Sequence, residues 1–119
     1  MSEHTEQMTF CNWMNLQYPN VLYFSVPNGG WLAGNDSQRA AQMNKLKSEG
    51  LLPGVADLFI AEPRGEFHGM FLEMKQTGGK LSENQKWFIA ESEKRGYFTA
   101  VAMNGFDDAR SMTEWYLKQ

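Results

Sequence analysis

Cysteine is almost absent from this chain of 119 residues, which contains Cys11 alone. A single cysteine cannot close an intrachain disulfide, so the chain is no disulfide-stapled domain and we expect it to work in a reducing cytoplasm. Neither His4 nor His68 has another cysteine or histidine at ligand spacing, which argues against a zinc site. Cys11 has no partner histidine either, so we expect a helix residue and not a nucleophile.

Long apolar runs are also missing. No stretch approaches the ~18 residues that a membrane-spanning helix requires. The first residues include Glu3, His4 and Glu6 in place of a basic start followed by an apolar segment, which is unlike a secretory signal. We therefore expect a protein that neither enters nor binds membranes.

Positive charge is scarce, because 11 Lys and Arg stand against 14 Asp and Glu and give a net charge of −3. A basic footprint is the usual first sign of a nucleic-acid-binding protein, and the composition lacks it. Three lysines nevertheless fall close together, at Lys75, Lys80 and Lys86. A bound dication can also attract phosphate to a protein that is acidic overall, so a metal-centred site remains compatible with this charge.

Hydrophobic periodicity and turn residues divide the chain into helices and strands without any linker, so we expect one domain over residues 1–119. The fold class is α/β, with four strands and four helices. The helix expected at 82–96 should bury some combination of Trp87, Phe88 and Ala90. In chain order the expected elements are a helix at 2–17, a strand at 21–26, a helix at 35–50, strands at 54–60 and 67–75, a helix at 82–96, a strand at 97–103 and a helix from 106.

Two of these strands should form a hairpin. Residues 54–60 and 67–75 are rich in β-branched and aromatic side chains, and the turn-forming sequence Glu62-Pro63-Arg64-Gly65 separates them. Antiparallel pairing of the two segments follows from this short connection.

We expect three charged side chains to converge on this hairpin. Because side chains alternate along a strand, Glu73 and Lys75 share one face while Leu72 and Met74 point into a core. If Asp57 lies opposite Glu73, two like charges about 4 Å apart repel by roughly 4 kcal/mol at an effective dielectric near 20. Such a pair requires a cation, and Mg²⁺ or Mn²⁺ suits two carboxylates with room for water.

The order of Asp57 and Glu73-Met74-Lys75 across a hairpin resembles the signature of PD-(D/E)xK nucleases. Further segments make the chain similar, over nearly its whole length, to the stand-alone virus-type replication-repair nuclease (VRR-NUC) domain. Ala56 stands where the signature leads one to expect proline, and Pro53 lies three residues earlier. The segments that carry the similarity to the VRR-NUC domain are 26–30, 46–59, 72–75, 78–82, Gln85 and 96–97.

The resemblance implies a PD-(D/E)xK restriction-endonuclease-like core, with a central mixed four-stranded sheet flanked by helices. It also assigns roles to the charged residues of the hairpin. Asp57, Glu73 and the backbone carbonyl of Met74 would hold Mg²⁺ or Mn²⁺ against a phosphate. Lys75 would position the attacking water or stabilise the growing charge. Acting as a base is the less suitable role, because its pKa would have to fall by several units from about 10.4 beside two carboxylates.

The first helix offers one more ligand. In related nucleases a glutamate of this helix completes the metal shell, and the spacing of Glu3 and Gln7 resembles that feature. We therefore favour Glu3, with Glu6 in reserve. A solvated acidic first turn that interacts favourably with the helix dipole explains both glutamates equally well.

Gln85 has two explanations. The sequence Ser82-Glu83-Asn84-Gln85 matches a capping box, in which the glutamine side chain bonds the serine amide. The resemblance instead implies a catalytic glutamine that points into the site. We expect the catalytic role to prevail, and both roles together only if the capping bond is weak.

Several residues could contact DNA. The amides of Asn28, Gly29 and Gly30 could face a phosphate, although a simple turn also explains them. Lys80 lies on a loop beside Lys75 and is a candidate backbone contact. The second helix carries Arg39, Lys45 and Lys47, either as a phosphate-contacting face or as a solvated one.

The activity that the resemblance implies is that of a metal-dependent, structure-selective endodeoxyribonuclease. We expect a homodimer that resolves four-way (Holliday) junctions, in the cytoplasm or at the nucleoid of a bacterial or phage-infected cell. A domain of this size has no room for a module that reads sequence, so shape recognition is favoured. A flap or other branched-DNA nuclease and a non-catalytic DNA-binding module are the alternatives.

Overall fold

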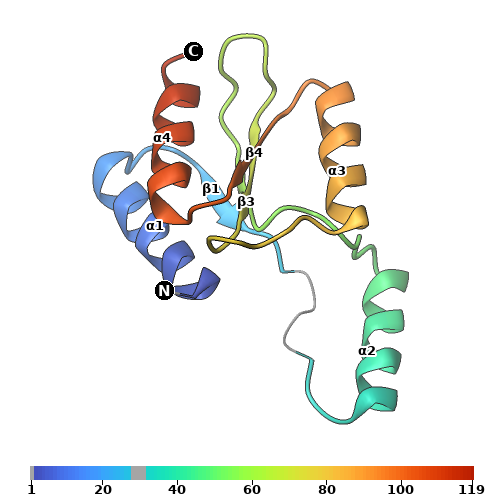
Figure 1. Cartoon of the computed structure of the whole chain (residues 1–119). Coiled ribbons are helices and arrows are strands. Elements are labelled where there is room, and N and C mark those ends of the chain that lie inside the picture. Colours follow the sequence, from blue (N-terminus) through green and yellow to red (C-terminus); the bar gives the residue numbers. More distant parts are fainter. Residues whose placement is uncertain (1, 28–31) are drawn as a thin grey trace.

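The computed structural model describes residues 2–27 and 32–119, and the order of its helices and strands is the predicted one (Figure 1). Single strands alternate with helices except at one hairpin in the middle of the chain. The elements are α1 (Glu3–Gln17), β1 (Tyr23–Ser25), α2 (Asp36–Ser48), β2 (Leu58–Ile60), β3 (Met70–Met74), α3 (Glu83–Lys94), β4 (Phe98–Ala102) and α4 (Phe106–Leu117).

The four strands form one mixed sheet in the order β1-β2-β3-β4. β1 pairs with β2 and β2 with β3 in antiparallel fashion, whereas β3 and β4 are parallel and are connected through α3. The α/β class, the mixed sheet and the hairpin are therefore confirmed.

The hairpin strands are shorter than predicted. Gly54 adopts a φ of 93° and turns the chain ahead of β2, so residues 54–57 do not extend the strand. On the other side, the amide of His68 donates to the carbonyl of Gly96 and not to β2. The sequence pattern of 54–60 and 67–75 is that of strands, but these backbone hydrogen bonds go elsewhere.

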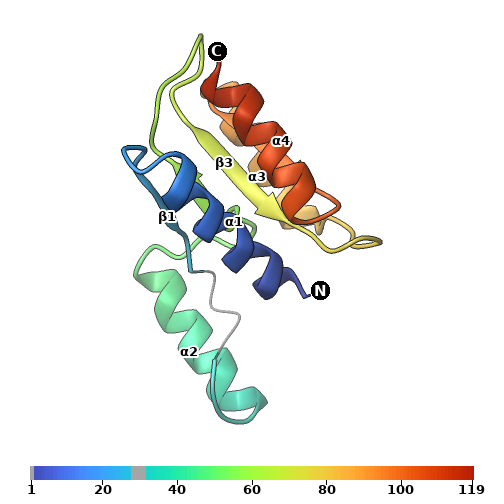
Figure 2. The ribbon, with the colours of Figure 1, turned by 90° about the vertical axis from the view of Figure 1, so that its left-hand side faces the viewer.

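One face of the sheet carries the hydrophobic core and is covered by α1 and α4, which lie side by side (Figure 2). Alternation along β2 and β3 directs every second side chain to this face. The fully buried residues there include Leu58, Ile60, Met70, Leu72 and Met74 of the sheet, Phe10 and Met14 of α1, and Ala109 and Tyr116 of α4.

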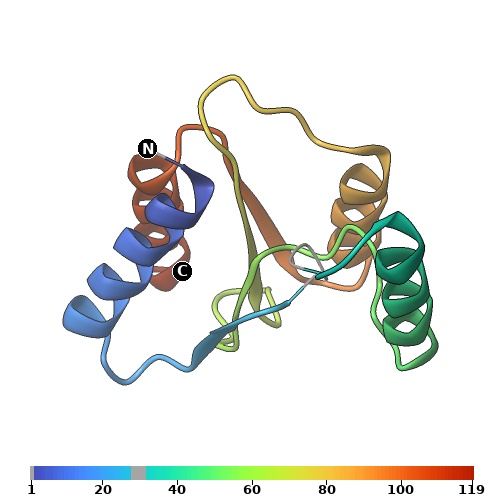
Figure 3. The same ribbon diagram turned by 90° about the horizontal axis from the view of Figure 1, so that it is seen from below.

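The opposite face is covered by α3, as the view from below shows (Figure 3). Phe88 of α3 meets Phe71 of β3 edge to face, with ring centroids 4.9 Å apart, and Ser92 shares a 2.6 Å hydrogen bond with Thr99 of β4. Of the three residues from which the buried face of α3 was predicted, Phe88 packs on the sheet, whereas Trp87 and Ala90 are exposed. The contact face runs at helical spacing through 85, 88, 89 and 92, which places 87 and 90 on the solvent side.

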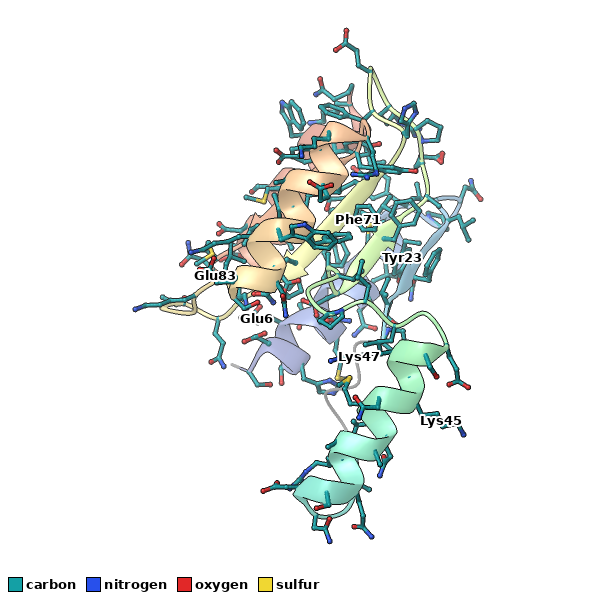
Figure 4. All side chains as sticks on the ribbon, turned by 90° about the vertical axis from the view of Figure 1, so that its right-hand side faces the viewer. Glu6, Tyr23, Lys45, Lys47, Phe71 and Glu83 are labelled. Carbon is teal, nitrogen blue, oxygen red and sulfur yellow. The ribbon has the colours of Figure 1, made fainter. Side chains whose placement is uncertain are left out.

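The helix α2 extends away from the sheet and has no buried residue (Figures 1 and 4). Its start is the predicted one, with Asn35 and Gln38 forming a capping box. Lys45 and Lys47 are two residues, or about 200°, apart and leave the helix in different directions (Figure 4). These lysines therefore do not build one phosphate-contacting face. No helix of the described chain is long and apolar enough to cross a bilayer.

Candidate active site

Asp57 and Glu73 face each other at the end of the hairpin. Leu58 pairs with Leu72, and one residue further along this register Asp57 stands opposite Glu73. The carboxylate oxygen Oδ2 of Asp57 accepts a 2.7 Å hydrogen bond from the backbone amide of Met74. This bond replaces a backbone-to-backbone hydrogen bond between the strands at the end of β2, and it fixes the Asp57 side chain against β3.

Glu73 is buried, with 4% of its surface exposed, yet it has two polar partners. The side-chain amide of Gln85 in α3 donates to its Oε1 at 2.9 Å. The ammonium of Lys75, itself 12% exposed, lies 3.9 Å from the same oxygen. Glu73 and Lys75 thus share a face of β3, as strand alternation predicts.

Burial sets the electrostatics of the two carboxyl groups. Burial raises the pKa of Asp57, although the Met74 amide opposes the shift. Burial and the charge of Asp57 raise the pKa of Glu73 to about 8, with Lys75 acting in the opposite direction. Near neutral pH the pair therefore retains a proton, because the single ammonium does not compensate two buried negative charges.

Gln85 makes both the capping contact and a contact with the carboxylate pair. Its side-chain oxygen Oε1 accepts from the Ser82 backbone amide at 2.9 Å, and its own backbone amide donates to Ser82 Oγ at 3.1 Å. Its Nε2 meanwhile donates to Glu73. The two contacts do not compete, because the side-chain amide has separate acceptor and donor ends. A catalytic role of Gln85 stays a prediction.

The two glutamates of the first helix have different surroundings. The charge of Glu3 is among the causes that raise the pKa of both Asp57 and Glu73. Glu6 instead accepts a 2.8 Å hydrogen bond from the amide of Phe106 at the start of α4. Of the two candidates, Glu3 is the one whose charge acts on the carboxylate pair.

The oxygen atoms of Asp57 and Glu73 are the type of ligand that a hard divalent cation prefers. Such ions are held by one or two carboxylates together with waters and substrate phosphate, and the raised pKa values of Asp57 and Glu73 mark a place where added positive charge is stabilising. No group of three or more His, Cys, Asp and Glu side chains in the described ranges is gathered closely enough to hold a metal by itself. The carbonyl of Met74 as a ligand stays a prediction.

The predicted DNA contacts are placed only in part. Asn28, Gly29 and Gly30 lie outside the described residues. Lys80 is exposed on the loop that joins β3 to α3, close in sequence to Lys75. Its contact with a DNA backbone stays a prediction.

Two supporting contacts were not predicted from the sequence. Gly54 packs against the backbone of Asn84, so closely that a Cβ atom would overlap the Asn84 carbonyl. The loop that leads to Asp57 is thereby seated on the residue next to Gln85. The sequence signal for this contact was the Pro53-Gly54 turn, which ends three residues before Asp57. The second contact is the hydrogen bond between the Phe106 amide and Glu6, for which the local sequence gives no signal.

Comparison with known proteins agrees with this geometry. A family model described as the VRR-NUC domain matches residues 3–104. A solved structure described as a "VRR_NUC domain protein" superposes with a TM-score of 0.82 at 27% sequence identity, over 99% of this chain and 89% of that one. Among curated proteins no match was found.

Proposed function

This chain belongs to the VRR-NUC domain family, and we propose that it is a metal-dependent nuclease that hydrolyses DNA phosphodiester bonds at Asp57, Glu73 and Lys75. The observation that carries the proposal is the apposition of two carboxyl groups with raised pKa values, one of which, Glu73, lies 3.9 Å from the ammonium of Lys75. Perturbed acids beside a positioned lysine are typical of catalytic sites.

Each residue has a distinct task in this proposal. Asp57 and Glu73 hold Mg²⁺ or Mn²⁺, with the Met74 carbonyl and Glu3 completing the shell. When bound there, the ion supplies positive charge that polarises the scissile phosphate.

The remaining side chains act around that centre. Lys75 orients the attacking water and stabilises charge that grows on the phosphate. Gln85 holds Glu73 in place through its amide. Lys80 contacts the DNA backbone from the rim of the site.

A cleavage assay tests the proposal. We expect labelled branched DNA to be cut with Mg²⁺ or Mn²⁺ and left intact with EDTA, and Glu73→Gln to abolish cutting while the protein remains folded. The exposed Glu93→Gln is the matched control for the loss of one charge. Cutting by Glu73→Gln at the wild-type rate would remove this site from consideration and favour a non-catalytic DNA-binding module.

The finer proposal concerns the substrate. A single small domain favours recognition of DNA shape, and symmetrical incision of a four-way junction requires two sites related by a two-fold axis. We therefore expect a homodimer that cuts four-way junctions. Sedimentation as a monomer at micromolar concentration, together with preferred cutting of flaps, would replace junction resolution by flap cleavage and leave the nuclease proposal intact.

A further inference from the structure

The first turn of α1 is joined to the first turn of α4 by one side chain. The N-cap residue of α4 is Gly105, which has no side chain to bond the free amides that begin a helix. Glu6 supplies the missing acceptor from 100 residues away, through the 2.8 Å bond from the Phe106 amide to Oε2. A carboxylate is favourable there because it also faces the positive end of the helix dipole.

Gly105 is shaped to admit this carboxylate. Its φ is 68°, and a Cβ atom on it would lie 2.6 Å from Cδ of Glu6. Glycine at this position therefore serves both the backbone conformation and the approach of Glu6.

The same turn also holds the strand that carries the proposed catalytic lysine. The amide of Gly105 donates to the carbonyl of Lys75 at 3.1 Å, and the amide of Lys75 donates to Ala102 at 3.0 Å. The backbone of Lys75 is thus fixed by the end of β4 and by the turn to which Glu6 is bonded.

Glu6 is one helical turn from Glu3 on α1. Residues three apart lie on neighbouring positions of a helix, so a contact that fixes Glu6 also fixes the direction of Glu3. Further along α1, tertiary side-chain hydrogen bonds come from Tyr23, which bonds Cys11 and Asn15.

We propose that Glu6 is a positioning residue that caps α4 and thereby fixes the Lys75 backbone and the first turn of α1, which carries Glu3, without binding the metal itself. This inference rests on the proposed metal-dependent function. It assigns the two glutamates of α1 to different tasks, one to the metal and one to the fold around it.

Two substitutions separate positioning from ligation. Glu6→Gln keeps an oxygen that accepts from the Phe106 amide but removes the charge that a metal ligand would need. Glu6→Ala removes both. The exposed Glu93→Ala is the control for loss of a glutamate elsewhere.

The readouts are Mn²⁺ affinity by calorimetry and amide hydrogen exchange at Phe106 in the metal-free protein. We expect Glu6→Ala to lose protection at Phe106 and to bind Mn²⁺ at least about tenfold more weakly, as residues that orient metal ligands do. Glu6→Gln and Glu93→Ala should retain wild-type values of both. A cap that served stability alone would lower the melting temperature of Glu6→Ala but leave Mn²⁺ affinity unchanged.

Two results would overturn the inference. One is tenfold weaker Mn²⁺ binding by Glu6→Gln with Phe106 still protected, which would make Glu6 a ligand. The other is wild-type Mn²⁺ affinity in Glu6→Ala after Phe106 has lost protection. If Glu6→Ala does not fold, the Mn²⁺ affinity of Glu6→Gln decides alone. Wild-type protein that binds no Mn²⁺ would instead overturn the proposed function together with this inference.

Discussion

The side-chain amide of Gln85 donates to Oε1 of Glu73 at 2.9 Å, from a helix on one layer to a strand on the next. Its direction is fixed because the amide oxygen of Gln85 is already bound by Ser82. The helix cap therefore orients the nitrogen, and not the oxygen, towards the buried carboxylate. A local capping motif in this way contributes a specific donor to the candidate site.

Gln85→Glu should disrupt the site while preserving the cap. The new carboxylate can still accept from Ser82, but it places a third acid against Glu73 and Asp57. We expect cleavage to slow by about 10- to 100-fold, the range found for partners of metal ligands. Single-turnover cleavage of a branched DNA measures the effect.

Ser82→Ala is the control for that substitution. It removes the capping oxygen, at a cost of about 1 kcal/mol in stability, but leaves the donor to Glu73. Cleavage below its melting temperature should match wild type. Equal slowing in Ser82→Ala and Gln85→Glu would show that the helix start, and not the contact with Glu73, limits the reaction.

The stability of the metal-free protein should fall as pH rises from about 4.5 to about 8. Burial and Asp57 raise the pKa of Glu73 to about 8 from an ordinary 4.5, so the folded state binds a proton that the unfolded state has released. The stabilisation is complete below 4.5 and is lost as pH passes 8. One such group gives a slope of at most about 1.4 kcal/mol per pH unit.

Urea unfolding at a series of pH values measures this slope. Glu73→Gln should flatten it, because a carboxamide does not titrate. Saturating Mn²⁺ should also flatten it, since a cation replaces the proton as the compensating charge. An equally steep profile in Glu73→Gln would assign the pH dependence to other groups.

Local rules predicted much of the fold. Asn35 and Ser82 begin helices because their side chains cap them, and both caps are present as expected. Strand alternation placed Glu73 and Lys75 on one face and Leu72 and Met74 in the core. Each of these features depends on residues within a few positions of one another.

Features that depend on distant contacts were beyond such rules. Strand β2 begins only at Leu58, because the Met74 amide donates to the side chain of Asp57 and not to a backbone carbonyl of residues 54–57. The buried face of α3 was misjudged because apolar type alone does not define which side of a helix meets the sheet. The bond between Glu6 and Phe106 joins opposite ends of the chain and has no local signature.

Lys75→Met should separate metal binding from chemistry. The lysine lies 3.9 Å from Glu73 and is mostly buried, so an unbranched apolar side chain can occupy its volume. We expect Mn²⁺ affinity to be retained, because the carboxylates remain, and cleavage to fall by about 100-fold or more from lost charge stabilisation. Calorimetry and cleavage on the same preparation measure both.

The metal-free variant provides a second readout. Lys75 opposes the rise in the pKa of Glu73, so its removal should extend the loss of stability to higher pH. A Lys75→Met variant that cuts at the wild-type rate would contradict the assigned role of the lysine.

Gly54→Ala should damage the site through the loop that leads to Asp57. Gly54 has a φ of 93°, and a methyl group on it would overlap the carbonyl of Asn84, beside Gln85.

Gly50 offers a matched control, because its φ is 106° but nothing lies within 4 Å of the added atom. Both alanine variants bear backbone strain of about 1–3 kcal/mol. Only Gly54→Ala must also move Asp57 away from α3, so we expect a larger loss of stability in urea and weaker Mn²⁺ binding in that variant alone. Equal effects in the two variants would mean that strain, and not the seat of this loop on α3, accounts for the glycine.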